Sequence, residues 1–271
     1  MTTRVLRRRE MLGGLAGALA AAPLVSSSLV RAQDALQLAS TPFKVLSRAA
    51  VTLQVNFVGG TLINVGYTTP NGNNPAGFGN TLHLWPSTAD AVPWNREPEA
   101  SAVVLGTSSQ GDQNLLDVSI TDGAYLIGYA VGPARTPPVW SPYSGVVATA
   151  FIPPATGGSA NANYAYASAA LDLRFVGSVS LVYRFAFLSG FRARSSGAWV
   201  GLWTGATTSY AVPPDWSAAI RSDSEAGVSG LNDIRIVRNG TYTLGLYAEG
   251  YDADPAKLDL TRLAASLTFS V

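Results

Sequence analysis

The feature that most constrains the fold is a repeat at a spacing of 118 residues. The matches keep both order and spacing: 51–59 with 169–177, Leu84-Trp85 with Leu202-Trp203, and Phe151 with Phe269. Asp122–Tyr125 and Asn239–Tyr242 match at 117, a slip of one residue that a loop can absorb. A repeat of this length indicates two copies of one structural unit, which together account for nearly all of the chain after residue 32.

Hydrophobic side chains alternate with polar ones in both copies. Val51, Leu53 and Val55 alternate with Thr52 and Gln54, a pattern typical of a half-buried β-strand. The first copy has predicted strands at 51–57, 63–67, 81–85, 102–106, 115–121, 124–131 and 146–152. The second has them at 171–175, 179–187, 199–203, 234–237, 241–248 and 264–271. No segment is a convincing helix. About seven short strands in each copy favour a β-sandwich.

Two tyrosines indicate which kind of sandwich to expect. Tyr125 and Tyr242 each follow a turn and open an apolar strand. They resemble the corner before strand F of immunoglobulin-like and fibronectin-type domains, which implies that each hydroxyl bonds to nearby backbone. The resemblance covers both copies and is one of architecture, not of a specific family. We therefore expect an all-β protein with two tandem immunoglobulin-like β-sandwich domains that arose by internal duplication.

The sequence leaves open which side chain is buried in two Leu-Trp pairs, Leu84-Trp85 and Leu202-Trp203. Such sandwiches often bury a Trp on strand C, so we expect Trp85 and Trp203 to be buried. In the alternative, the two tryptophans are exposed and Leu84 and Leu202 are buried.

The N-terminus is typical of an export signal. Arg8-Arg9-Glu10-Met11-Leu12 resembles the twin-arginine motif, an uncharged stretch covers 11–30, and Val30-Arg31-Ala32 fits a cleavage site. A general secretory signal and an uncleaved membrane anchor are the alternatives. The expected organisation is a signal peptide at 1–32, a first sandwich at 33–154 and a second at 155–271, with a linker at 153–161. The predicted location is periplasmic or secreted.

Composition excludes several classes of function. The signal holds five of the 18 basic and one of the 17 acidic residues, so the remainder has a net charge of about −3. This argues against a nucleic-acid partner. The chain has no Cys, both Met lie in the signal, and His83 is the single His. We therefore expect no catalytic residues, no cofactor and no metal site, and a structural role for His83.

Two loops concentrate carboxylates. One surrounds Trp94 and the other lies in the second copy; their members are Asp90, Glu97, Glu99, Asp252, Asp254 and Asp259. An Asp-x-Asp loop can contribute to a Ca²⁺ site, but that ion takes six to eight oxygens and no EF-hand spacing is present. Solvated loop charge is the simpler interpretation.

Aromatic and basic loops are the candidates for binding. Residues 136–143 combine three prolines with Trp140 and Tyr143, and a stiff aromatic loop loses little entropy on binding. The matched loops 71–79 and 189–197 differ, because only the second carries Arg192 and Arg194. The candidate partner-binding residues are Phe78, Trp140, Tyr143, Arg192 and Arg194. Alternatively, Trp140 packs against a sandwich, and the Arg pair meets Asp252 and Asp254.

The expected function is a non-catalytic exported module that recognises a protein partner or forms a subunit of an extracytoplasmic or membrane-associated assembly. A carbohydrate-binding protein that uses exposed loop aromatics, Trp94 or Trp140, is the alternative. The membrane is a partner only if the signal is retained as an anchor. An enzyme of another type is the third hypothesis, and fold alone does not decide among them.

Overall fold

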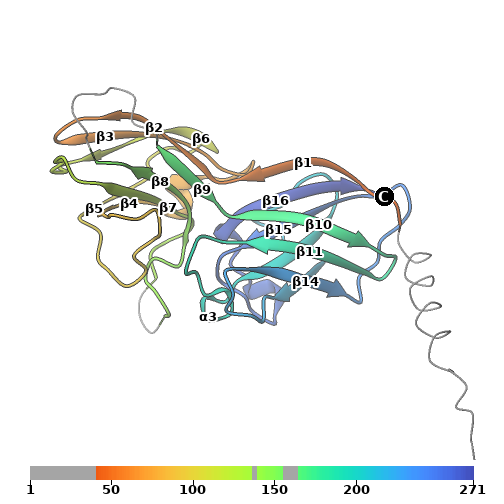
Figure 1. Ribbon diagram of the computed structural model, residues 1–271. Helices are drawn as coiled ribbons and strands as arrows, with labels where there is room; N and C mark the ends of the chain where they lie inside the picture. The colour runs from red at the N-terminus through yellow and green to blue at the C-terminus, as the bar shows by residue number, and fades with distance from the viewer. Residues whose placement is uncertain (1–40, 136–138, 155–163) are drawn as a thin grey trace, which may run out of the picture. The chain divides into compact units, whose positions relative to one another are not determined.

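Antiparallel β-sheets make up most of the protein. The computed structural model describes residues 41–135, 139–154 and 164–271, and these ranges contain sixteen strands in four antiparallel sheets (Figure 1). The four sheets lie in one compact unit, residues 40–271. The all-β class is confirmed. The predicted signal and most of the predicted linker lie outside the described residues. None of the described helices has the length and hydropathy needed to cross a membrane.

The four sheets form two packed pairs. The first sheet pair combines β2 (Thr52–Val58), β3 (Leu62–Thr68) and β6 (Gln110–Leu116) with β5 (Ala100–Val103), β4 (Thr81–Pro86), β7 (Tyr125–Ala130), β8 (Val146–Ile152) and β9 (Ala165–Ser168). The second sheet pair combines β10 (Ala170–Val176), β11 (Ser180–Ala186) and β14 (Ala226–Asn232) with β1 (Lys44–Ala50), β16 (Leu263–Ser270), β15 (Thr241–Tyr247), β12 (Trp199–Thr204) and β13 (Trp216–Ala219). Contacts of β2 with β8 and of β10 with β16 join the sheets of each pair, an arrangement compatible with β-sandwiches.

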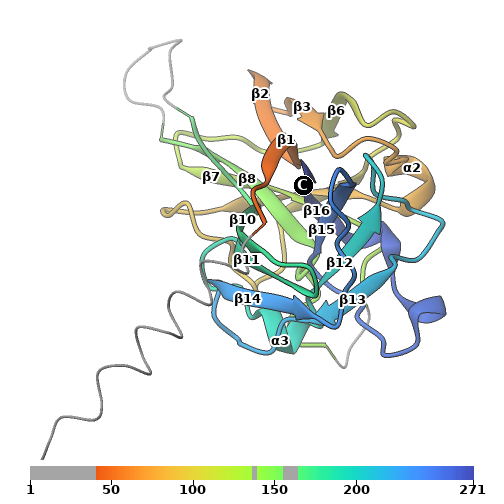
Figure 2. The same cartoon turned by 90° about the vertical axis from the view of Figure 1, so that its right-hand side faces the viewer.

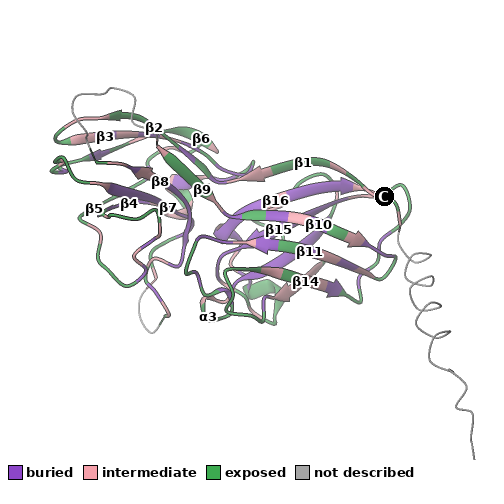
Figure 3. Cartoon of the chain, viewed as in Figure 1, coloured by how far each residue is buried: buried purple, intermediate pink, exposed green. Residues whose placement is uncertain are grey.

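The central strands of the two five-stranded sheets are buried on both faces, whereas the edge strands β1, β5, β9 and β13 are half-buried or exposed. β4, β7 and β8 are buried over most of their length (Figure 3), and so is β12. One face packs on the three-stranded sheet, and loops cover the other. Trp85 and Trp203 are therefore buried, as predicted, and each indole N–H donates to a loop carbonyl, that of Arg96 or Val212. Leu84 and Leu202 are also fully buried, so the two placements are not alternatives.

In each sheet pair, one edge strand belongs to the segment of chain that leads directly into the other sheet pair. β1 runs through Val51 directly into β2 of the first pair, yet it pairs with β16 of the second, with Ala49 opposite Ser266. β9 runs through Ala169 into β10, yet it pairs with β8 of the first. Val51 and Ala169 are fully buried where the chain crosses. The sequence analysis did not predict this exchange of strands.

Short helices and several strand bounds also differ from expectation. Two one-turn helices, α2 (Pro75–Phe78) and α3 (Ala193–Ser196), occupy matched loops and each ends at a Gly with positive φ (Figure 2). Two 3-10 turns, η1 (Pro255–Lys257) and η2 (Leu260–Arg262), precede β16. The strand predicted at 234–237 was wrong. Ile234 and Ile236 are buried in a loop, and the strand lies upstream as β14.

The tyrosine hydroxyls bond to backbone as the resemblance implied. The Tyr125 hydroxyl accepts from the Thr121 amide at 3.0 Å and donates to the Ser119 carbonyl at 3.2 Å. The Tyr242 hydroxyl accepts from the Val237 amide at 2.7 Å. Both rings are buried, so each hydroxyl holds the chain that leads into β7 or β15.

Removing either hydroxyl should destabilise the protein. We expect Tyr125→Phe and Tyr242→Phe each to lower the free energy of unfolding by about 0.5–1.5 kcal/mol, since a partly buried backbone amide loses its partner. Urea unfolding measures the change. Tyr251→Phe, on a side chain that is 37% exposed, is the control. If both buried variants unfold at the same urea concentration as the unaltered protein, the hydroxyls do not hold these corners.

Candidate functional site

Aromatic side chains from both sheet pairs meet around Trp94. Its indole N–H donates to the Ser189 carbonyl at 2.9 Å. Its ring packs against Trp140 and Phe191, with centroids 5.3 and 5.5 Å apart. Trp140 also packs against Phe191 of the second sheet pair, with centroids 5.7 Å apart, which is the alternative left open by the sequence. Trp94 is only 8% exposed, so its face is not available to stack on a sugar as the carbohydrate alternative requires.

Phe78 lies at a related contact. It ends α2 and stacks on Tyr210 of the second sheet pair, with centroids 5.2 Å apart and planes 17° from parallel. Gly72, at φ 87°, lies under the Tyr210 ring, and Gly190, at φ 75°, lies against Trp94 in the same way. An aromatic ring of each sheet pair therefore rests on a glycine of the other.

Tyr143 packs inside the first sheet pair. Its ring makes edge contacts with His83 and Trp85 at 5.3 and 5.4 Å between centroids. His83 is 8% exposed, and its Nδ1 bonds to the Ser101 hydroxyl at 2.8 Å. Burial lowers the pKa of His83 to about 4. The imidazole is therefore neutral at pH 7, and its neighbours fit the structural role expected for it.

A buried ion pair links the two sheet pairs. Arg262 and Glu249 of the second pair meet at 3.0 Å, and both side chains are 3% exposed. The Arg262 Nη1 also donates to the Val131 carbonyl of the first pair at 2.8 Å. The Ser144 hydroxyl donates to Glu249, and Arg135 lies 3.4 Å from the same carboxylate. These bonds satisfy charges that would otherwise be costly to bury.

A cleft of about 280 Å³ opens beside this ion pair. It is lined from the first sheet pair by Arg135, Val139, Trp140 and Ser144, and from the second by Arg194, Ser195, Ser196, Gly197, Glu249, Gly250 and Tyr251. The cleft brings together two predicted candidates, Trp140 and Arg194. Phe78, Tyr143 and Arg192 do not line it. Three residues of the same proline-rich loop, 136–138, lie outside the described residues.

Arg192 and Arg194 are both exposed on the loop around α3. The alternative pairing with Asp252 and Asp254 is not observed among the described residues, where Asp254 pairs with Lys257 at 3.5 Å. The nearby carboxylate is Asp223, whose pKa is lowered by the Ser195 amide and, less strongly, by the two arginines. Arg194 forms no salt bridge with any residue in the described ranges.

The acidic loops have local structural roles. Asp254 and Asp259 cap η1 and η2 by accepting from backbone amides, and Asp252 accepts from the Asp254 amide at 2.8 Å. The first loop leaves Asp90, Glu97 and Glu99 exposed. Within the described ranges, no three His, Cys, Asp or Glu side chains are grouped closely enough to hold a metal ion.

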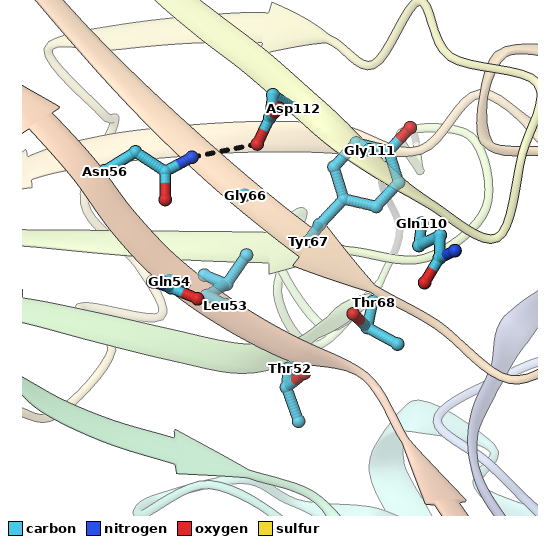
Figure 4. Close-up of a pocket in the computed structure, with 10 residues that line it drawn as sticks. All are labelled: Thr52, Leu53, Gln54, Asn56, Gly66, Tyr67, Thr68, Gln110, Gly111 and Asp112. Atoms are coloured by element: carbon cyan, nitrogen blue, oxygen red, sulfur yellow. Dashed lines mark hydrogen bonds between the residues drawn. The ribbon is translucent and has the colours of Figure 1, made fainter.

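A second hollow, of about 350 Å³, lies on the outer face of the β2-β3-β6 sheet (Figure 4). Its lining is mostly polar and includes no Lys or Arg: Thr52, Leu53, Gln54, Asn56, Gly66, Tyr67, Thr68, Gln110, Gly111 and Asp112. The sequence analysis did not single out these residues. The only local sign was a set of Asn and Gln at the outward positions of alternating strands.

No protein-family model matches the chain, and no curated protein matches its sequence.

Proposed function

We propose that the protein is exported and acts outside the cytoplasm, in the periplasm or as a secreted protein. The proposal rests on the twin-arginine-like motif at 8–12, the uncharged stretch at 11–30 and the cleavage site ending at Ala32. The membrane is a partner only if this signal is retained as an anchor.

We further propose that residues 33–154 and 155–271 are duplicated immunoglobulin-like units. Corresponding elements lie 118 residues apart in support of this proposal: β2 and β10, β3 and β11, α2 and α3, and β4 and β12. The order of pairing around them is also alike, with β4 between β5 and β7 and β12 between β13 and β15.

The proposed function is non-catalytic recognition of a protein partner, or membership of an extracytoplasmic assembly, through the cleft between the sheet pairs. The observation that carries it is the convergence of Trp140 and Arg194 with Tyr251 in one cleft. Trp, Tyr and Arg are the residues that most often dominate the energy of protein interfaces.

The chemistry of the cleft favours an acidic segment. Arg194 is exposed, while Glu249 is already neutralised by Arg262 and Arg135. The open side of the cleft therefore presents a guanidinium beside aromatic surface. A ligand with a carboxylate next to an apolar side chain would match both features. The carboxylate would accept two parallel hydrogen bonds from the guanidinium, and the apolar side chain would pack on the aromatic surface.

Selection from a displayed random-peptide library tests this function. We expect the enriched peptides to contain Asp or Glu beside an apolar residue. Arg194→Ala should weaken the best peptide by about 30-fold, the equivalent of about 2 kcal/mol for an interface anchor. Fluorescence anisotropy gives the dissociation constant.

Arg192→Ala is the matched control, because Arg192 is exposed on the same loop and does not line the cleft. It should change the dissociation constant by less than about twofold, as expected for a charge outside the contact. Enrichment of peptides without acidic residues, or equal losses in both variants, would contradict the proposal.

A further inference from the structure

The outer face of the β2-β3-β6 sheet carries an ordered network of side-chain amides. Asn56 Nδ2 donates to Asn64 Oδ1 at 2.9 Å and to Asp112 Oδ1 at 2.8 Å. Asn64 Nδ2 donates to Asn114 Oδ1 at 2.6 Å. These bonds cross all three strands and fix the orientation of the amides. Figure 4 shows Asn56 and Asp112 joined across the hollow.

Gly66 keeps the hollow open. It lies between Gln54 of β2 and Asp112 of β6 in the strand register. A Cβ on Gly66 would lie 3.1 Å from Asp112 Oδ1 and 3.2 Å from Asn56 Nδ2, with Asn56 Oδ1 at 3.5 Å. Any side chain at this position would therefore fill the space that these polar groups surround.

The second sheet pair shows that the fold does not require this arrangement. In the corresponding row, Arg184 lies between Asp172 and Val228. Thus Gln54-Gly66-Asp112 in one sheet is replaced by Asp172-Arg184-Val228 in the other, which has neither the glycine nor the amides. The glycine and the amide of this row belong to the first sheet pair, and a structural need common to both sheets does not explain them.

The lining selects a neutral, hydroxyl-rich ligand. Each sugar hydroxyl both donates and accepts a hydrogen bond, and amide, hydroxyl and carboxylate groups together offer both functions. No Lys or Arg lines the hollow, so an anionic ligand has no counter-charge there. Its volume is at the lower end of the ~300–1,000 Å³ usual for small-molecule sites. We propose that this hollow binds a neutral oligosaccharide, independently of the cleft between the sheet pairs.

The test uses the full chain and a panel of neutral oligosaccharides of glucose, mannose, galactose and N-acetylglucosamine, with uronic acid oligomers as the anionic comparison. Calorimetric titration gives each dissociation constant. At least one neutral oligosaccharide should bind. Gly66→Arg should abolish this binding, and it should fold because Arg occupies the corresponding position 184. Gln54→Ala, on an exposed side chain with no hydrogen bond to a described residue, should weaken binding about tenfold.

Arg184→Ala and Arg194→Ala are the controls and should leave binding unchanged. Three results would overturn the proposal: no binding of any neutral oligosaccharide, equal binding by the Gly66→Arg variant, or preference for uronic acid oligomers. Loss of sugar binding in Arg194→Ala but not in Gly66→Arg would also overturn it, because the sugar would then occupy the cleft. Failure of peptide binding at the cleft leaves these outcomes unaffected.

Discussion

Arg262→Ala should lower the free energy of unfolding by about 3–5 kcal/mol, the usual cost of breaking a buried ion pair from one side. The Arg262 and Glu249 side chains are each 3% exposed, so removal of the guanidinium takes the nearest cation from a buried carboxylate and leaves it only Arg135, at 3.4 Å. The same substitution removes hydrogen bonds to the Val131 and Pro133 carbonyls. Both carbonyls belong to the first sheet pair, so the contact between the pairs weakens as well.

Urea unfolding of the Arg262→Ala variant measures this loss. Lys257→Ala is the control, because Lys257 pairs with Asp254 on the surface, where an ion pair contributes about 0–1 kcal/mol. A loss for Arg262→Ala no larger than that of the control would mean that the Arg262–Glu249 contact does not hold the sheet pairs together.

Alternation predicted the strands whose inward side chains are large and apolar. β2 and β3 lie where alternation placed them, because a strand buried on one face must repeat every second residue. β4, β7 and β8 are buried over most of their length and lie where short apolar runs placed them. β14 was missed because its sequence, Ala226–Asn232, contains two Gly and little apolar contrast. Ile234 and Ile236 have the contrast, but they fill the core from a loop. Burial and strand pairing are separate properties, and the pattern reports only burial.

The candidate site was predicted in part for a similar reason. Loop chemistry pointed to Trp140 and Arg194, which do line one cleft. Glu249 and Arg262 were not predicted, since one partner of their network, Val131, lies 131 positions from Arg262. Nothing local in the sequence distinguishes a buried ion pair from solvated charges. The amide network was missed because its three strands are brought together only by the sheet.

The exchange of strands could not have been predicted from a repeat. β1 leads into β2 as β9 leads into β10, and the duplication proposed above makes the edges of β8 and β16 alike. A repeat is therefore compatible with either pairing of β1. The exchanged pairing has the larger consequence, because the chain then crosses between the sheet pairs twice, at Val51 and at Ala169. The cleft between them is thereby a fixed feature available for binding.

Pairs of introduced cysteines should show whether β1 pairs with β16, as in the exchanged arrangement, or with β8. The chain has no Cys, so a designed pair supplies the only thiols. In the exchanged arrangement Ala49 lies opposite Ser266. Without exchange, β1 would take the place of β9, where Ala167 lies opposite Thr149, and Ala49 would then face Thr149. Directly opposed residues of antiparallel strands have Cα atoms about 4.5–5.5 Å apart, within the range that a disulfide spans.

Peptide mass mapping of the oxidised full chain is the most direct test that exchanged strands join the sheet pairs into one body. We predict a disulfide in the Ala49→Cys, Ser266→Cys protein and two free thiols in the Ala49→Cys, Thr149→Cys protein. A disulfide in the second protein, with free thiols in the first, would contradict the exchange and the fixed cleft that depends on it.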